Sequence, residues 1–325
     1  MKTMLVCASH SPLMLMDMPP SSPDSQAFFG HVEAMRKRVA AFDPELVVVF
    51  GPDHFNGFFF DLMPSFCIGA AAETTADWGL PKLALDVPQD IAMACLDSVR
   101  GAGVDAALSW NMRPDHGISI ALRQFTAEPA RSKVLPIFIN CAAPPRPSLK
   151  RSRLFGAAVG NYLASLTQRV LIVASGGISH DPPTPRFEGA PLALRQRLVD
   201  RHVASDEELK QREARVMVAA SKLVKGEGPC LPPNETWDRA FVHTLLAGDA
   251  ATLDAITDAE IDREAGFGGH EVRTWVAAFA AMRELGPFVA RLDYYRVVPE
   301  WITGMGLISG EQTGEQAAAP GDARA

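Results

Sequence analysis

Four short, almost purely apolar runs are the strongest constraint that this sequence places on its fold. They are rich in Val, Ile, Leu and Phe, and they span Met4–Ala8, Leu46–Phe50, Val134–Asn140 and Val170–Ala174. Strands of this composition are buried on both faces, as in a parallel sheet that helices cover on each side. Because amphipathic stretches separate the runs, we predict an α/β fold with a central, mostly parallel sheet flanked by helices.

The sequence also predicts the helices that would cover this sheet. Ser21-Ser22-Pro23-Asp24 offers caps for a helix running to about Phe42, and a second helix is indicated over Pro88–Ala102. After Pro185 the amphipathic stretches become long and charged, at Ser205–Lys225, Trp237–Ala247 and Glu271–Leu285. We therefore expect a mainly helical C-terminal part that packs against the sheet.

The sequence shows no sign of a domain boundary within the chain. No linker rich in Ser and Gly or in charge divides the 325 residues, so we expect a single domain over residues 1–310. Residues 311–325 are mostly Gly, Ala, Gln and charged residues with little apolar content, which predicts a disordered tail.

Charge and cysteine usage argue against several classes of protein. The net charge is -7 and basic residues gather only in short pieces such as Arg36-Lys37-Arg38, so we expect no nucleic-acid partner. No apolar stretch reaches about 18 residues and the first residues lack the apolar run of a signal peptide, so we expect a cytoplasmic protein without membrane contact. The five cysteines never form a Cys-x-x-Cys pair, which argues against a disulfide framework or a thiolate metal site.

Three of the eight histidines directly follow predicted strands, namely His10, His54 and His180. The carboxyl ends of strands in an open α/β sheet line the crevice where ligands bind, so these side chains can converge there. His116, in the loop Pro114-Asp115-His116-Gly117 ahead of a helical stretch, can join them. One histidine alone is more often a turn or capping residue, whereas the joint placement favours a site.

A carboxylate would complete such a site. A ferrous centre that binds both a substrate and dioxygen typically uses two neutral imidazoles and one carboxylate. Glu271 follows the turn Gly268-Gly269 and begins a predicted helix, so it is a candidate. Spacing alone leaves this open, because the helix dipole also stabilises an acidic residue in the first turn without a metal. The segment His270-Glu271-Val272-Arg273-Thr274 lacks the second histidine of a zincin motif.

These residues lie in motifs that recur in a known family. The motifs, in chain order, are Ser9-His10-Ser11-Pro12, Pro52-Asp53-His54-Phe55-Asn56-Gly57, Asp115-His116-Gly117, Ser175-Gly176-Gly177 with Ser179-His180, His270-Glu271 with Thr274-Trp275, Tyr294-Tyr295-Arg296 and Pro299-Glu300-Trp301. In these motifs and their order, the sequence resembles the type III (LigB-type) extradiol dioxygenases over nearly its full length. It departs from the family pattern around Asn111-Met112-Arg113-Pro114 and in the C-terminal tail.

The resemblance implies a ring-opening enzyme with a mononuclear non-haem Fe(II) site. Its ligands would be His10, His54 and Glu271, and His116 and His180 would be the acid–base pair. The implied substrates are O2 and a 3-substituted catechol such as 3-(2,3-dihydroxyphenyl)propanoate or 2,3-dihydroxycinnamate, and the implied assembly is a homo-oligomer. His180 would take a proton from the catechol, and His116 would donate one as the ring opens.

Two other interpretations use the same residues. A zinc hydrolase could be built on the same His, His and Glu set, because zinc accepts those ligands with a bound water. A LigB-like protein could instead bind a ligand without catalysis, although a binding scaffold has no need for the pair His116 and His180.

The sequence says less about which residues would contact the carboxylate and the ring of a bound substrate. A substrate carboxylate would need a cationic or hydrogen-bonding partner, for which Arg296 is one candidate, with a surface ion pair as its alternative role. Three aromatic residues could line the ring pocket or belong to the core: Phe55, Phe58 and Phe59.

Overall fold

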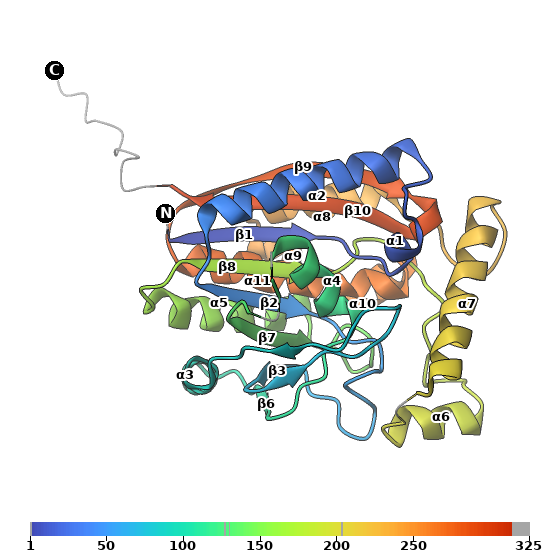
Figure 1. Cartoon of the computed structure of the whole chain (residues 1–325), viewed down its shortest axis with the longest axis horizontal. Helices are drawn as coiled ribbons and strands as arrows, with labels where there is room; N and C mark the ends of the chain where they lie inside the picture. Colours follow the sequence, from blue (N-terminus) through green and yellow to red (C-terminus); the bar gives the residue numbers. More distant parts are fainter. Residues whose placement is uncertain (1, 127, 130, 203, 314–325) are drawn as a thin grey trace.

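The four apolar runs lie side by side at the centre of one sheet. The computed structural model describes residues 2–126, 128–129, 131–202 and 204–313 (Figure 1). The runs form β1 (Thr3–Ala8), β2 (Leu46–Gly51), β7 (Val134–Ile139) and β8 (Val170–Ser175), paired in parallel in the order β7-β2-β8-β1. Every residue of these strands is buried, which explains their continuous apolar character. The predicted α/β sheet is confirmed.

Strands that the sequence did not predict extend this sheet on both sides. β3 (Phe66–Gly69) pairs antiparallel with β7, and β6 (Ala107–Ser109) pairs with β3. On the other side β10 (Thr303–Gln312) pairs antiparallel with β1, followed by β9 (Phe288–Val298). The full order is β6-β3-β7-β2-β8-β1-β10-β9. The C-terminal part therefore contributes two long strands as well as the predicted helices.

The end of β10 corrects one expected boundary. Glu311 and Gln312 were expected to begin a disordered tail, but they pair with Val289 and Phe288 of β9. Gln312 also accepts hydrogen bonds from the backbone amides of Lys2 and Thr3 through its side-chain oxygen. The remainder of the expected tail, from residue 314 onward, lies outside the described residues.

Helices cover both faces of the sheet, and each face has its own apolar core. The helices that contribute to one core are α1 (Leu13–Met16), α2 (Pro23–Phe42), α4 (His116–Phe125) and α7 (Asp206–Val224). Those of the other core are α3 (Gln89–Gly101), α5 (Leu149–Ala164), α8 (Glu235–Ala247), α9 (Ala250–Ala255), α10 (Asp258–Glu264) and α11 (Val272–Glu284). The remaining short elements are β4 (Ala72–Glu73), β5 (Ala84–Leu85), α6 (Leu192–Val199), η1 (Phe267–Glu271) and η2 (Pro299–Trp301).

The ends of the helices follow local sequence signals. Ser22 caps α2 by accepting a hydrogen bond from the Ser25 amide, and Ser205 caps α7 in the same way through Glu208. None of the described helices combines the length and the apolar character needed to cross a membrane.

The position of α7 matters most for the site. In Figure 1 the arrows of β1, β2 and β8 point toward the same edge of the sheet, and α6 and α7 stand beyond that edge. The loops that follow these strands therefore lie between the sheet and α7.

The contact between α5 and α11 gives a test of the fold. A Cβ atom on Gly156 of α5 would overlap the Ala277 carbonyl oxygen of α11. Gly156→Ala is therefore expected to lower the free energy of unfolding by about 1–3 kcal/mol, measured by urea denaturation. Gly30→Ala is the matched control, because Gly30 is a helical glycine of α2 with no atom within 4 Å of a new Cβ. It should stabilise the protein by about 0.5–1 kcal/mol, and equal effects of the two changes would contradict the close packing.

Candidate metal and active site

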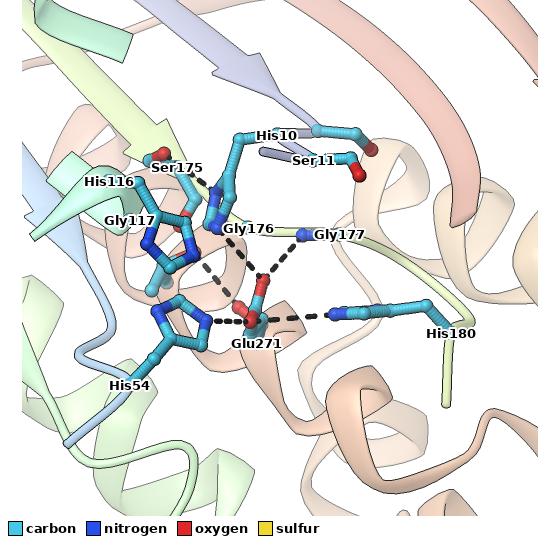
Figure 2. A network of polar contacts seen from close by, with 12 residues as sticks. His10, Ser11, His54, His116, Gly117, Ser175, Gly176, Gly177, His180 and Glu271 are labelled. Atoms are coloured by element: carbon cyan, nitrogen blue, oxygen red, sulfur yellow. Dashed lines mark hydrogen bonds and ion pairs between the residues drawn. The ribbon is translucent and has the colours of Figure 1, made fainter. Parts of the chain in front are cut away.

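The five side chains predicted from the sequence meet at one edge of the sheet (Figure 2). His10, His54 and His180 lie on the loops after β1, β2 and β8, while His116 begins α4 and Glu271 ends η1. The ring centroids of His10 lie 5.7 Å from His54 and 5.8 Å from His116. The rings of His54 and His116 are stacked at 4.2 Å. The structure thus brings together residues that are up to 261 positions apart in the chain.

Glu271 lies at the centre of this group. Its Oε1 atom is 3.0 Å from Nε2 of His54 and 3.5 Å from Nε2 of His180, and its Oε2 atom is 3.7 Å from Nε2 of His10. Figure 2 shows these side chains reaching the carboxylate from different sides. Burial raises the pKa of Glu271, but the facing imidazoles of His10, His180 and His54 outweigh it, so the pKa lies well below its ordinary value. The site therefore holds an ionised carboxylate.

The close approach of Glu271 to β8 depends on two glycines. A Cβ on Gly176 would lie 2.9 Å from both Cβ and the carbonyl oxygen of Glu271, so a larger residue there would push the carboxylate away. The amide of Gly177 donates a hydrogen bond of 2.7 Å to Oε2 of Glu271. Trp275, one turn along α11, donates from its indole nitrogen to the Gly176 carbonyl at 3.0 Å. The turn after β8 thereby fixes the direction of the carboxylate.

His10 and His54 are each held from behind at Nδ1. Nδ1 of His10 lies 3.0 Å from the Ser175 hydroxyl, and Nδ1 of His54 lies 3.1 Å from Oδ2 of Asp115. Burial, followed by weaker effects of neighbouring histidines, lowers the pKa of His10 to about 3, so its imidazole is neutral and able to bind a metal. Burial also lowers the pKa of His54, but Asp115 and Glu271 outweigh it and the pKa lies well above normal. The negative charges of Asp115 and Glu271 stabilise the protonated ring of His54, and they would stabilise a metal cation at its Nε2 atom in the same way.

His116 and His180 are also held at Nδ1, by different partners. Nδ1 of His116 contacts the buried carboxylate of Asp77. Nδ1 of His180 lies 3.2 Å from the Ile178 carbonyl oxygen, which can only accept a hydrogen bond. His180 therefore donates from Nδ1, and in the neutral ring Nε2 carries a free lone pair directed at the site.

Several supporting residues were not predicted as part of the site. Asp115 caps α4 through the amide of Gly117 at 2.8 Å and accepts the His54 amide at 2.8 Å, so it joins two loops of the site. Its place before His116 was a visible capping signal. Asp77 gave no such signal, because its contact with His116 arises only in the folded chain.

Another buried carboxylate fixes the residue before His180. Asp238 of α8 accepts hydrogen bonds from the amide and hydroxyl of Ser179 at 2.9 and 2.8 Å, and from the Tyr295 hydroxyl at 2.7 Å. Burial raises the pKa of Asp238 to about 6 despite these donors. The network ties the His180 loop to α8 and β9.

The donor set fits one metal ion. Nitrogen ligands from histidine together with an anionic oxygen suit divalent iron or zinc. Ligand atoms of His10, His54 and His116 lie within 4.8 Å of one another, as do those of Asp77, Asp115 and His116. In the second group, Asp115 accepts hydrogen bonds from backbone amides, and Asp77 contacts Nδ1 of His116. These carboxylates therefore orient the histidine rings through Nδ1.

The cavity around this centre decides between the alternatives that the sequence left open for the aromatic residues and for Arg296. Phe55 and Phe59 line it as expected, but Phe58 stacks on Phe138 at 3.8 Å and belongs to the core. Arg296 is not among the cavity residues; its side chain is 58% exposed and lies 3.8 Å from Asp24. It is therefore no partner for a bound substrate.

The fold and the site together define an α/β protein with an imidazole–carboxylate centre able to hold a metal ion. Residues 4–306 match the family model described as the catalytic LigB subunit of aromatic ring-opening dioxygenase, and the chain belongs to this family. It is thus a ring-cleaving oxidoreductase of a family that uses a non-haem metal, as the sequence resemblance implied.

Similar proteins carry a more specific name. The chain is 46% identical to a 2,3-dihydroxyphenylpropionate/2,3-dihydroxicinnamic acid 1,2-dioxygenase of Cupriavidus pinatubonensis, covering 96% of this chain and 99% of that protein. A protein of the same name from Paraburkholderia xenovorans is 46% identical, with 98% and 100% covered. One from Mycolicibacterium vanbaalenii is 43% identical, with 93% and 96% covered.

Proposed function

We propose that this chain cleaves the ring of a 3-substituted catechol beside its diol, with O2 as the second substrate and one Fe(II) ion as the cofactor. The substrates that we propose are 3-(2,3-dihydroxyphenyl)propanoate and 2,3-dihydroxycinnamate, in line with the names of the relatives. The observation that carries the proposal is the ionised Glu271 carboxylate facing Nε2 of His10 and His54, with two further histidines in the same cavity.

The proposed ligands of the ion are His10, His54 and Glu271. When bound, Fe(II) supplies a centre that takes up both the catechol oxygens and O2 and passes electrons from one to the other. Ser175 and Asp115 would keep Nε2 of the two histidines directed at the ion by holding Nδ1. Gly177 would hold the carboxylate through its amide.

The proposed acid–base pair is His180 and His116. His180 donates from Nδ1 to the Ile178 carbonyl, so its free Nε2 can take a proton from a catechol hydroxyl. His116 contacts Asp77 at Nδ1, which fixes the orientation of its ring in the cavity, and its Nε2 would donate a proton as the C–C bond breaks. Both atoms of O2 enter the ring-opened product.

Three further properties belong to the proposal. The chain forms one domain that extends to the end of β10 at Gln312, supported by an eight-stranded sheet that takes strands from both halves of the chain. A homo-oligomer is supported by apolar side chains exposed on α7, namely Met217, Val218 and Val224. A cytoplasmic location is supported by free, buried thiols of the kind that persist in a reducing compartment, namely Cys7, Cys67, Cys95 and Cys141.

Anaerobic reconstitution with Fe(II) tests the proposed activity. Addition of O2 and 3-(2,3-dihydroxyphenyl)propanoate is expected to consume one O2 per catechol and to produce the yellow ring-opened product. The matched sample carries Zn(II), which accepts the same ligands but has no redox chemistry and should give no O2 uptake. Equal activity of the two samples, or no ring opening with Fe(II), would refute the proposal.

A further inference from the structure

A guanidinium group enters the active-site cavity from α7. Arg212 lines the same cavity as His54, His116, His180 and Glu271, and its side chain is half-buried. Its Nη1 atom lies 3.4 Å from Oδ1 of Asn56. Across the described ranges of the chain, this guanidinium pairs with no carboxylate. A half-buried cation without an anionic partner is costly, which makes Arg212 a candidate for binding an anion.

The acidic residues nearby on α7 already have partners. Glu208 forms an ion pair with Arg197 and lies 2.8 Å from Nε2 of His202, and Glu213 accepts a hydrogen bond of 2.9 Å from the backbone amide of Trp78. Burial lowers the pKa of Arg212 and the positive charges of Arg197 and Arg215 lower it further, while the carboxyl groups of Glu208 and Asp53 act in the opposite direction. The guanidinium groups of Arg197, Arg212 and Arg215 all line this cavity.

Arg212 is linked to the metal side of the cavity through one amide. The Asn56 amide nitrogen donates to Oδ2 of Asp115 at 3.0 Å, and the same oxygen lies 3.1 Å from Nδ1 of His54. Apolar side chains line the cavity as well, including Phe55, Phe59, Leu198 and Val216. An aromatic ring at the histidines, with an apolar spacer and a terminal anion directed at α7, matches this distribution of groups.

We propose that Arg212 binds the side-chain carboxylate of the catechol substrate and so makes the enzyme select acidic 3-substituted catechols. The inference rests on the proposed ring cleavage and adds the residue that determines specificity. A guanidinium can donate two parallel, charge-assisted hydrogen bonds to a carboxylate, which a neutral side chain cannot reproduce. Arg215 lines the same cavity and adds positive charge beside it.

The test compares two substrates that differ in charge, 3-(2,3-dihydroxyphenyl)propanoate and 3-propylcatechol. In Arg212→Met, kcat/KM for the acid is expected to fall by roughly ten- to a hundredfold, mainly through KM, because a charge-assisted contact is lost. The value for 3-propylcatechol should change far less, so the preference for the acid should collapse. Arg212→Lys should restore part of the preference. The control is Lys210→Met, which removes one positive charge from an exposed position on the same helix outside the cavity and should keep the preference.

The outcomes separate this inference from the proposed function. If wild type cleaves both catechols and Arg212→Met keeps the same ratio of kcat/KM, the assignment of Arg212 is wrong while the ring cleavage stands. If wild type cleaves neither catechol, the proposed function is wrong, and anaerobic calorimetry of the acid with both proteins still tests Arg212. Equal affinity of the two proteins for the acid would refute the carboxylate contact. Thermal unfolding of each variant identifies losses that arise from misfolding.

Discussion

Glu271→Gln is expected to abolish turnover and to weaken iron binding by more than about a hundredfold. The amide keeps the size of the side chain and an oxygen that can accept from Gly177, but it removes the anion that His10, His54 and His180 face. Loss of a group behind a metal ligand typically costs ten- to a hundredfold in affinity, so loss of a charged ligand should cost more.

Iron content after anaerobic reconstitution and gel filtration measures this effect directly. Glu284→Gln is the matched control, because Glu284 lies on the same helix, α11, at an exposed position and should leave iron and turnover unchanged. If Glu271→Gln retained a full equivalent of iron, Glu271 would leave the proposed ligand set. His10, His54 and His116 would then be the remaining group with suitable spacing.

The centre of the fold could be predicted because its signal is local. The four central strands, β1, β2, β7 and β8, are buried on both faces, so each corresponds to a nearly continuous apolar run in the sequence. β10 is nearly as buried but contains three glycines within ten residues, TGMGLISGEQ, and glycine gives little strand signal. Its position depends on pairing with β1, from which it is about 300 residues distant in the chain.

The residues of the site also divide into those that a local sequence signal predicts and those whose position depends on contacts in the folded chain. His10, His54 and His180 were predictable as neighbours because the ends of parallel strands share one edge of a sheet. Asp77 was not, because its contact with His116 depends on how the β4–β5 region folds over α4. The sequence left two roles open for Arg296, a carboxylate partner and a surface ion pair, for a related reason. Its side chain lies near Asp24 on the surface, whereas Arg212 reaches the cavity only through the packing of α7 beyond the sheet.

The roles of His116 and His180 remain predictions, and substitution by Gln separates them from the proposed ligands. Each variant is expected to keep its iron but to lose roughly 10²- to 10⁴-fold in kcat, the usual contribution of a positioned acid or base. Glutamine cannot relay a proton, yet its amide can donate to Asp77 in place of His116, or to the Ile178 carbonyl in place of His180. The buried partners therefore keep a hydrogen bond, and the loss should lie in chemistry and not in folding.

Iron content and single-turnover kinetics distinguish these two variants from each other and from ligand loss. His180→Gln should slow the formation of the bound catechol anion, seen as a change in ultraviolet absorbance before O2 is added, whereas His116→Gln should form that anion normally and slow the later ring opening. His243→Gln is the control, because His243 is exposed on α8 and is not among the residues that line the cavity. One combined outcome would contradict these assignments, namely loss of iron in His116→Gln together with full iron in Glu271→Gln. His116 would then be the third ligand in place of Glu271, since both residues lie next to His54 in the same cavity.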